Sequence, residues 1–306
     1  MEKLLTCITF LMLPALASGA APQEIIDEIK DLEKTLGFRG TRNFTKSSTT
    51  IHAYYRCYYT GKLDLPDSYD GLQLTQGTNG CAVDEAKYDV FFYPIEAVAN
   101  GSSPVTSSLA QAPVERLLVV VPHEDFHEHD EAHVLPPAIT EAAATLIGFL
   151  TAGEFARTKF GPDSPQYQKL SKDPDLFLDK AKIVNEYYSR LSSVFRSARS
   201  GEITNQDALA RKEEMFRQMQ NECGAISPAP SSFNKCLAAN NNAGLAFDVT
   251  YTRYYPLLYR VYAAQGRDLK STIDAMKRVL ASKSLSEQGA VAAFEALAVK
   301  PTPAIP

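Results

Sequence analysis

The sequence has no excess of basic residues, and its N-terminal apolar run is short. The 31 lysines and arginines face 36 aspartates and glutamates, which gives a formal net charge of −5. A surface with this balance offers no broad cationic field for phosphates, so we exclude nucleic acid as a partner. Because the N-terminal apolar run is too short to cross a bilayer, we also expect no permanent membrane anchor.

The first twenty residues have the layout of a secretory signal peptide. Lys3 precedes an apolar core, and Ala15-Leu16-Ala17 offers a cleavage site of the A-x-A type. The alternative is a buried N-terminal helix. We favour a cleaved signal peptide over residues 1–20, which predicts a secreted or periplasmic protein.

Cysteine is scarce, and removal of the leader leaves only Cys57, Cys81, Cys223 and Cys236. An even number of cysteines in an oxidising compartment predicts two disulfides. Because sequence neighbours close the smaller loops, we favour Cys57 with Cys81 and Cys223 with Cys236. None of the spacings has the C-x2-4-C form of a structural zinc site, so a zinc site built from thiols is not expected.

Hydrophobic periodicity predicts an α+β fold that is predominantly α-helical, with a small N-terminal sheet. Segment 22–38 has the spacing of an amphipathic helix, and segments 49–60 and 87–95 are rich in the aromatic and β-branched residues of strands. Beyond residue 115 the signals are nearly all helical, with helices predicted over 173–201, 240–266 and 268–283. We expect one domain over residues 21–300 and a disordered, proline-rich tail over 301–306.

Histidine is also scarce, yet four of the five histidines lie in the eleven positions from His123 to His133. His123, Glu124 and His127 form an HExxH motif, and positions i and i+4 of a helix share one face, so both imidazoles can reach one metal ion. Glu124 then lies beside that face, where it can act as general base on a metal-activated water. Pro122 starts this helix or kinks a longer one.

A catalytic zinc ion usually takes three protein ligands, so one more is required. One candidate is His133, which lies ten residues after His123, as the third histidine of the metzincin pattern does. Asp130, however, stands where that pattern has glycine. Glu141 lies near the start of a second helix that begins at Pro136 and Pro137. An antiparallel arrangement of the two helices would bring its carboxylate back to the histidines, as in gluzincins. We favour Glu141 and keep His133 as the alternative.

Three motifs that follow one another along the chain make it resemble the predicted bacterial aminopeptidases, a family of gluzincin-like zinc metallopeptidases. They are HEDFH (123–127), TEAAA (140–144) and NNAGLAFDVTYTRYYP (241–256). The family has asparagine and serine where this chain has Thr140 and Ala142. The resemblance covers roughly residues 85–282, which leaves a more divergent N-terminal part over 21–84.

The resemblance implies a helical zincin-like catalytic core that hydrolyses peptide bonds with Zn²⁺. It places Tyr251 in a motif helix as the candidate donor to the tetrahedral oxyanion, with Tyr254 and His129 as alternatives. The alternative for Tyr251 is a core residue of an amphipathic, tyrosine-rich helix. Asn241 and Asn242, in the same motif, are candidates for orienting the ligands or the substrate.

The sequence therefore predicts a zinc-dependent hydrolase, an aminopeptidase-like metallopeptidase acting on peptide substrates. In this interpretation His123, His127 and Glu141 bind zinc, and Glu124 is the general base. The alternative is a secreted, non-catalytic binding protein in which zinc holds two helices together. That protein would have a closed site with four protein ligands, for instance with His133 added to the other three.

Overall fold

The computed structural model describes residues 21–77, 80–130, 135–236, 240–282 and 285–299. The predicted leader, the predicted tail 301–306 and His133 lie outside the described residues. Helices dominate the fold, and the strands form one small sheet, which confirms the predicted α+β, predominantly helical class. The helices are α1 (Pro22–Leu36), α2 (Ser107–Gln111), α3 (Val114–Phe126), α4 (Pro137–Phe160), α5 (Pro165–Leu170), α6 (Asp173–Arg199), α7 (Asn205–Gly224), α8 (Asn242–Thr252), α9 (Tyr255–Ala264), α10 (Leu269–Leu280) and α11 (Glu287–Ala298), with 3-10 turns η1 (Tyr69–Gly71) and η2 (His127–His129).

The sheet is antiparallel and has the strand order β2-β1-β3, from β1 (Tyr54–Gly61), β2 (Gln73–Gln76) and β3 (Tyr88–Ile95). In this register Tyr58 of β1 lies opposite Leu74 of β2 and Phe91 of β3. The buried rings of Tyr58 and Phe91 contact Phe247 of α8, with ring centroids 5.3 and 5.0 Å away. Because alternate side chains of a strand share one face, this aromatic face fixes the sheet against α8.

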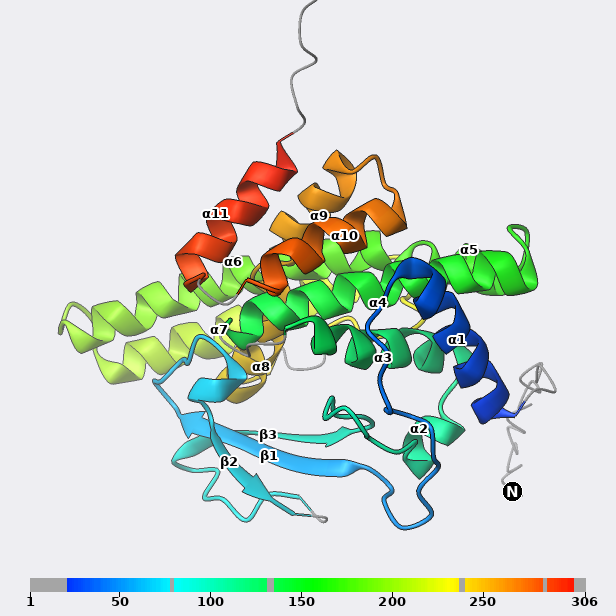
Figure 1. The fold of residues 1–306 in the computed structure, drawn as a ribbon. Coiled ribbons are helices and arrows are strands. Elements are labelled where there is room, and N and C mark those ends of the chain that lie inside the picture. Colours follow the sequence, from blue (N-terminus) through cyan, green and yellow to red (C-terminus); the bar gives the residue numbers. More distant parts are fainter. Residues whose placement is uncertain (1–20, 78–79, 131–134, 237–239, 283–284, 300–306) are drawn as a thin grey trace, which may run out of the picture.

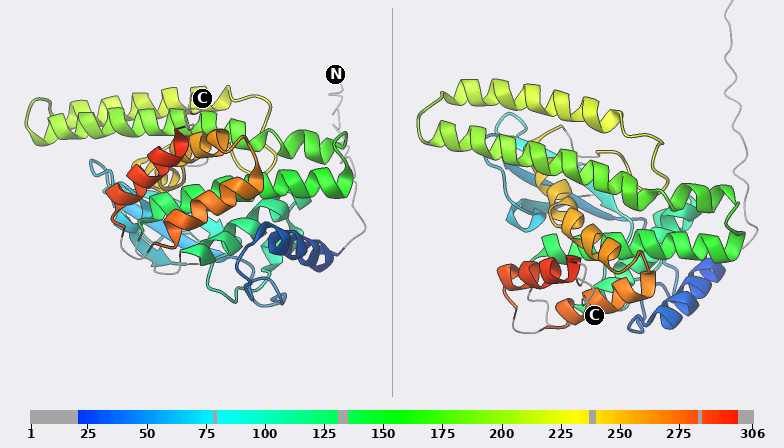
Figure 2. Two further views of the ribbon diagram at one scale, coloured as in Figure 1. Left: turned by 45° about the horizontal axis from the view of Figure 1, so that its top comes forward. Right: turned by 90° about the horizontal axis from the view of Figure 1, so that it is seen from above.

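Helices α3 and α4 pack against each other in the middle of the molecule (Figure 1). The sheet and α8 lie on one side of this pair, and α9, α10 and α11 lie on the other (Figure 1). Helix α1 packs against α3, while α6 and α7 run side by side as a long hairpin that extends past the rest of the fold (Figure 2). Helix α4 is thus covered on several sides, which explains why most of its residues are buried.

Two of the differences from the predicted element boundaries have local backbone causes. Helix α1 stops at Leu36 because Gly37 adopts the left-handed conformation, with φ of 80°. Segment 240–266 is two helices rather than one, with the break at Arg253 and Tyr254. Pro256 lies in the first turn of α9, where its missing N–H leaves no hydrogen bond unmade.

Two disulfides have the pairing favoured from the sequence, Cys57–Cys81 and Cys223–Cys236, with Cα atoms 5.5 and 5.8 Å apart. The first ties β1 to the segment before β3. The second ties the end of α7 to the loop that leads toward α8. Among the residues that the structure describes, none of the helices combines the length and the hydrophobicity that a bilayer crossing requires.

Candidate metal centre

Small residues on α4 let α3 approach closely at the level of the histidines. Gly148 lies two turns after Glu141, so the two share a face of α4. A Cβ atom added at Gly148 would lie 2.9 Å from the carbonyl oxygen of Val119 and 3.2 Å from the Cβ of His123. Only a residue without a side chain therefore fits at this point of the α3–α4 contact.

Helix α3 ends with the first four residues of the HExxH motif, and His127 follows as its C-cap and as the first residue of η2. Pro122 lies inside the helix rather than at its start. Asp125, the buried residue in the middle of the motif, faces the N-terminal segment. It accepts hydrogen bonds from Lys30 (2.5 Å), Thr41 Oγ1 (2.7 Å) and Asn43 Nδ2 (3.0 Å). Because these donors satisfy a buried carboxylate, they tie the end of α3 to α1 and to the loop that follows it.

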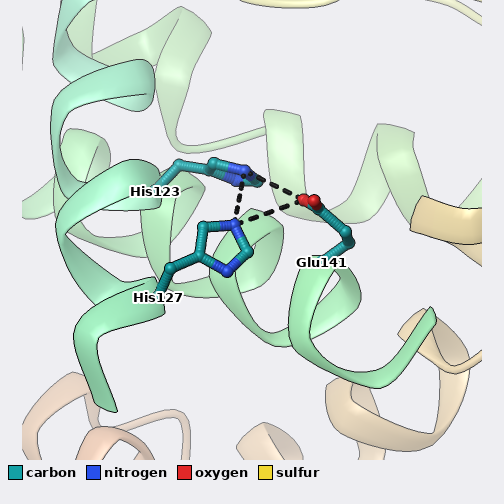
Figure 3. A group of neighbouring side chains, drawn as sticks. All are labelled: His123, His127 and Glu141. Carbon is teal, nitrogen blue, oxygen red and sulfur yellow. Dashed lines mark hydrogen bonds and ion pairs between the residues drawn. The ribbon is translucent and has the colours of Figure 1, made fainter. Parts of the chain in front are cut away.

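His123 of α3, His127 at the C-cap of α3 and Glu141 of α4 point toward one another (Figure 3). Glu141 Oε2 lies 3.2 Å from His123 Nε2 and 3.3 Å from His127 Nε2, and the two Nε2 atoms are 3.3 Å apart. Two imidazoles on successive turns and one carboxylate from an antiparallel neighbour thus present three ligand atoms to one point. Among the described residues, this is the group of histidine, cysteine and acidic side chains that could hold a metal ion.

The chemistry of these donors fits a divalent cation. Glu141 Oε2 is buried and has no hydrogen-bond partner among the described residues, so this atom is available as a ligand. Burial lowers the pKa of His127, but the adjacent Glu141 carboxylate outweighs that effect and raises it to about 9. Burial raises the pKa of Glu141, but His127 and His123 together hold it below its usual range. A divalent cation bound by these side chains would have to displace the proton that the raised pKa of His127 retains.

Glu124 lies next to this group without belonging to it. Its side chain is half-buried, and burial raises its pKa, although His123 and His127 act in the opposite direction. A partly open cavity of about 530 Å³ is lined by His123, Glu124 and Tyr251, among others. This carboxylate can therefore reach a small molecule that contacts the imidazole of His123.

Tyr251 of α8 lines the same cavity, and its ring lies nearly parallel to that of His123, with centroids 6.3 Å apart and planes at 27°. Burial raises the pKa of Tyr251 well above the usual value, so its hydroxyl keeps its proton. The hydroxyl of Tyr254 instead donates to Glu287 Oε1 at 2.6 Å, away from the cavity. Of the two tyrosines considered from the sequence, Tyr251 is the one that the structure places beside the histidines.

The other candidates lie elsewhere. His129 is buried against Phe38 and Phe126, and its Nε2 accepts a hydrogen bond from the backbone N–H of Arg39. Its ring therefore packs on the N-terminal segment, on a different part of the fold from the cavity lining, because the turn η2 carries it past the end of α3. His129, named from the sequence as an alternative donor to the oxyanion, does not line the cavity.

Asn241 and Asn242 hold the start of α8 to the sheet. Asn241 caps the helix, because its Oδ1 accepts from the N–H of Gly244, while its Nδ2 donates to the carbonyl of Val90. The Nδ2 of Asn242 donates to the carbonyls of Lys62 and Asp64. Since both residues lie more than two turns before Tyr251, they position α8 as a whole and touch none of the three converging side chains.

Some residues of the site have no sequence motif that could have identified them. The hydroxyl of Tyr69 in η1 donates to Glu141 Oε1 at 2.9 Å, although Tyr69 lies outside every segment with a periodic pattern. Two ion pairs line the cavity, Arg116 with Glu96 (2.6 Å) and Lys180 with Asp248 (2.9 Å). Only Asp248 of these four residues lies in a motif quoted from the sequence, and only the fold pairs it with Lys180.

Comparison with curated proteins gave no match, and neither did comparison with solved structures. One family model does match, and it is described as "Putative aminopeptidase". The match spans residues 83–291, which is more than half of the chain and includes α3, α4 and α8 with the converging side chains. The chain therefore belongs to the family described as "Putative aminopeptidase".

Proposed function

We propose that the protein is a zinc-dependent peptidase of the gluzincin type, with aminopeptidase-like activity on peptide substrates. The observation that carries this proposal is the convergence of His123, His127 and Glu141 beside a cavity that is also lined by Glu124. Family membership supports hydrolysis of peptide bonds. The pairing of an HExxH motif with a glutamate from the next helix supports the choice of zinc.

The donor set favours zinc over harder cations. Two imidazole nitrogens and one carboxylate oxygen are the ligand set of many catalytic zinc sites, whereas magnesium and calcium prefer oxygen ligands alone. A zinc ion held by these residues would supply a Lewis acid that activates water and polarises the scissile carbonyl. His123, His127 and Glu141 would fix its position from two packed helices.

Glu124 is the proposed general base. Its carboxylate lies in the cavity lining, next to the proposed ligands, which is the place from which it can take a proton from water. Burial raises its pKa, which brings the carboxylate closer to the neutral range in which a general base is most effective. The same carboxylate would then deliver that proton to the leaving amine.

Tyr251 is the proposed donor to the oxyanion that develops on the substrate carbonyl. It lines the cavity from α8, with its ring beside that of His123, and its raised pKa keeps the hydroxyl proton available for donation. We also propose that the protein acts outside the cytoplasm. The two disulfides support this location, because such bonds persist mainly in oxidising compartments.

The test compares the wild type with Glu124→Gln, using bound-metal analysis and turnover over a peptide library. Glu128→Gln is a matched control, because it removes a neighbouring carboxylate that does not line the cavity. We expect all three proteins to retain about one zinc per chain. Glu124→Gln should lose a factor of about 10²–10⁴ in kcat, while Glu128→Gln keeps the wild-type rate.

The two functions considered from the sequence give different results in this experiment. A non-catalytic protein in which zinc only holds α3 and α4 together would bind zinc and hydrolyse nothing in the library. Hydrolysis that survives unchanged in Glu124→Gln would rule out the proposed mechanism, even with zinc bound. An absence of stoichiometric zinc in the wild type would rule out the metal site itself.

A further inference from the structure

The side chain of Glu141 has a second partner besides the two histidines. The hydroxyl of Tyr69 donates a hydrogen bond to Glu141 Oε1 with a donor–acceptor distance of 2.9 Å. Glu141 is buried, so this bond is shielded from water. Hydrogen bonds from neutral donors to ionised carboxylates are stronger than those between two neutral groups, and this one therefore restrains the carboxylate.

Tyr69 itself is held firmly by two parts of the fold. Its backbone N–H donates to Thr250 Oγ1 of α8 at 2.8 Å, and that hydroxyl donates in turn to the carbonyl of Ala246. Its ring contacts Tyr58 of β1 and Phe247 of α8, with centroids 6.5 and 6.0 Å away. The hydroxyl therefore approaches Glu141 from a fixed direction.

The phenol is the donor in this bond and the carboxylate is the acceptor. A phenol has a hydroxyl hydrogen to donate, and the carboxylate oxygen Oε1 has lone pairs to accept it.

The two oxygens of the Glu141 carboxylate have different neighbours. Oε1 is occupied by Tyr69, while Oε2 lies within 3.3 Å of both imidazole nitrogens and has no hydrogen-bond partner among the described residues. A carboxylate without such a partner could rotate and present either oxygen. With Oε1 held, Oε2 is the atom that faces His123 and His127.

We infer that Tyr69 is a positioning residue for the metal site, which orients Glu141 so that Oε2 faces the two histidines. The inference rests on the proposed zinc site. Tyr69 lies before residue 83, where the family match begins, so the N-terminal part of the chain completes a site whose other members lie inside that match. Partners of this kind, hydrogen-bonded to metal ligands, orient the ligand and tune its affinity.

The experiment measures the zinc dissociation constant by chelator competition for the wild type, Tyr69→Phe and Tyr58→Phe. Tyr69→Phe removes one oxygen and keeps the ring that contacts Tyr58 and Phe247. Tyr58→Phe removes a hydroxyl from the same aromatic cluster, and within the described structure that hydroxyl makes no hydrogen bond to Glu141. We expect zinc binding about 10- to 100-fold weaker in Tyr69→Phe and unchanged in Tyr58→Phe.

A double-mutant cycle separates an effect through Glu141 from a general loss of structure. In a Glu141→Ala background the carboxylate is absent, so adding Tyr69→Phe should change the zinc dissociation constant little. A loss of the same size in both backgrounds would overturn the positioning role. Thermal unfolding of the zinc-free proteins shows whether Tyr69→Phe folds, and the cycle removes any loss of affinity common to both backgrounds.

The other outcomes are also decisive. If the wild type binds zinc and Tyr69→Phe binds it equally well, the inference is wrong while the proposed function stands. If Tyr69→Phe keeps its zinc affinity but loses turnover, the hydroxyl acts on the substrate, which also overturns the positioning role. If the wild type binds no zinc, both the proposed function and this inference fail.

Discussion

Gly148→Ala should separate the two helices that carry the proposed zinc ligands. The new methyl group would lie 2.9 Å from the carbonyl oxygen of Val119 and 3.2 Å from the Cβ of His123. The first of these atoms belongs to the backbone of α3, so no side-chain rotation can relieve the clash. Helix α3 must shift by roughly half an ångström to restore ordinary contact distances.

The size of the effect follows from two opposing contributions. Overpacking a close-packed contact typically costs about 1–3 kcal/mol of unfolding free energy. Replacing glycine by alanine inside a helix stabilises by about 1 kcal/mol, because alanine loses less backbone entropy on folding. Gly153→Ala serves as the control, because Gly153 lies in the same helix and its added Cβ would be 3.9 Å from the nearest atom. It gains the helix stabilisation without the overpacking, so the difference in stability between the two variants measures the overpacking alone.

We expect Gly148→Ala to be less stable than Gly153→Ala by about 1–3 kcal/mol in urea unfolding of the zinc-free proteins. The shift of α3 also moves His123 relative to Glu141, so zinc affinity should fall by roughly tenfold in Gly148→Ala alone. Isothermal titration or chelator competition measures that affinity. Equal stability and equal zinc affinity in the two variants would refute the close approach of α3 and α4 at Gly148.

Two further predictions concern pH. Because the pKa of His127 is raised to about 9, zinc must displace its proton, and zinc affinity should rise about tenfold per unit between about pH 7 and 8.5; a flat titration would contradict this. Burial, together with Lys277 and Arg39, lowers the pKa of His129 from 6.5 to about 4, so the folded state binds fewer protons than the unfolded state between these values. The stability that neutral His129 provides above pH 6.5 is therefore lost as pH falls toward 4, by about 2 kcal/mol between about pH 7 and 5. His129→Gln, which keeps an acceptor for Arg39, should flatten that loss in unfolding experiments on the zinc-free protein, and an unchanged pH dependence would exclude His129 as its cause.

Several parts of the fold could be predicted because their signals are local. The enrichment of segments 49–60 and 87–95 in aromatic and β-branched residues marks strands, since such side chains pack well on a pleated surface. The helical segments could be predicted because apolar residues recur about once per helical turn along the sequence. The break between α8 and α9 depends on where Pro256 can be accommodated, and apolar periodicity alone did not place it.

The roles of the buried polar residues could not be predicted in the same way. Asn241 and Asn242 stand in a motif that suggested a role at the site, yet they hold the start of α8 to the sheet. His129 lies two residues from a proposed ligand, yet its ring packs on Phe38. A polar side chain takes whichever partner the fold brings to it, and neighbours in the sequence need not be neighbours in space.

The sequence by itself determined that His123 and His127 share a face, because the helical period alone places positions i and i+4 together. It also favoured Glu141 as their partner, although His133 remained open. Only the tertiary structure decided how close Glu141 comes to the histidines, because that distance depends on the packing of α3 against α4 at Gly148. The tertiary structure alone also brought Tyr69 to Glu141, since a contact across 72 residues depends on how β1 and α8 pack and leaves no periodic signal in the chain.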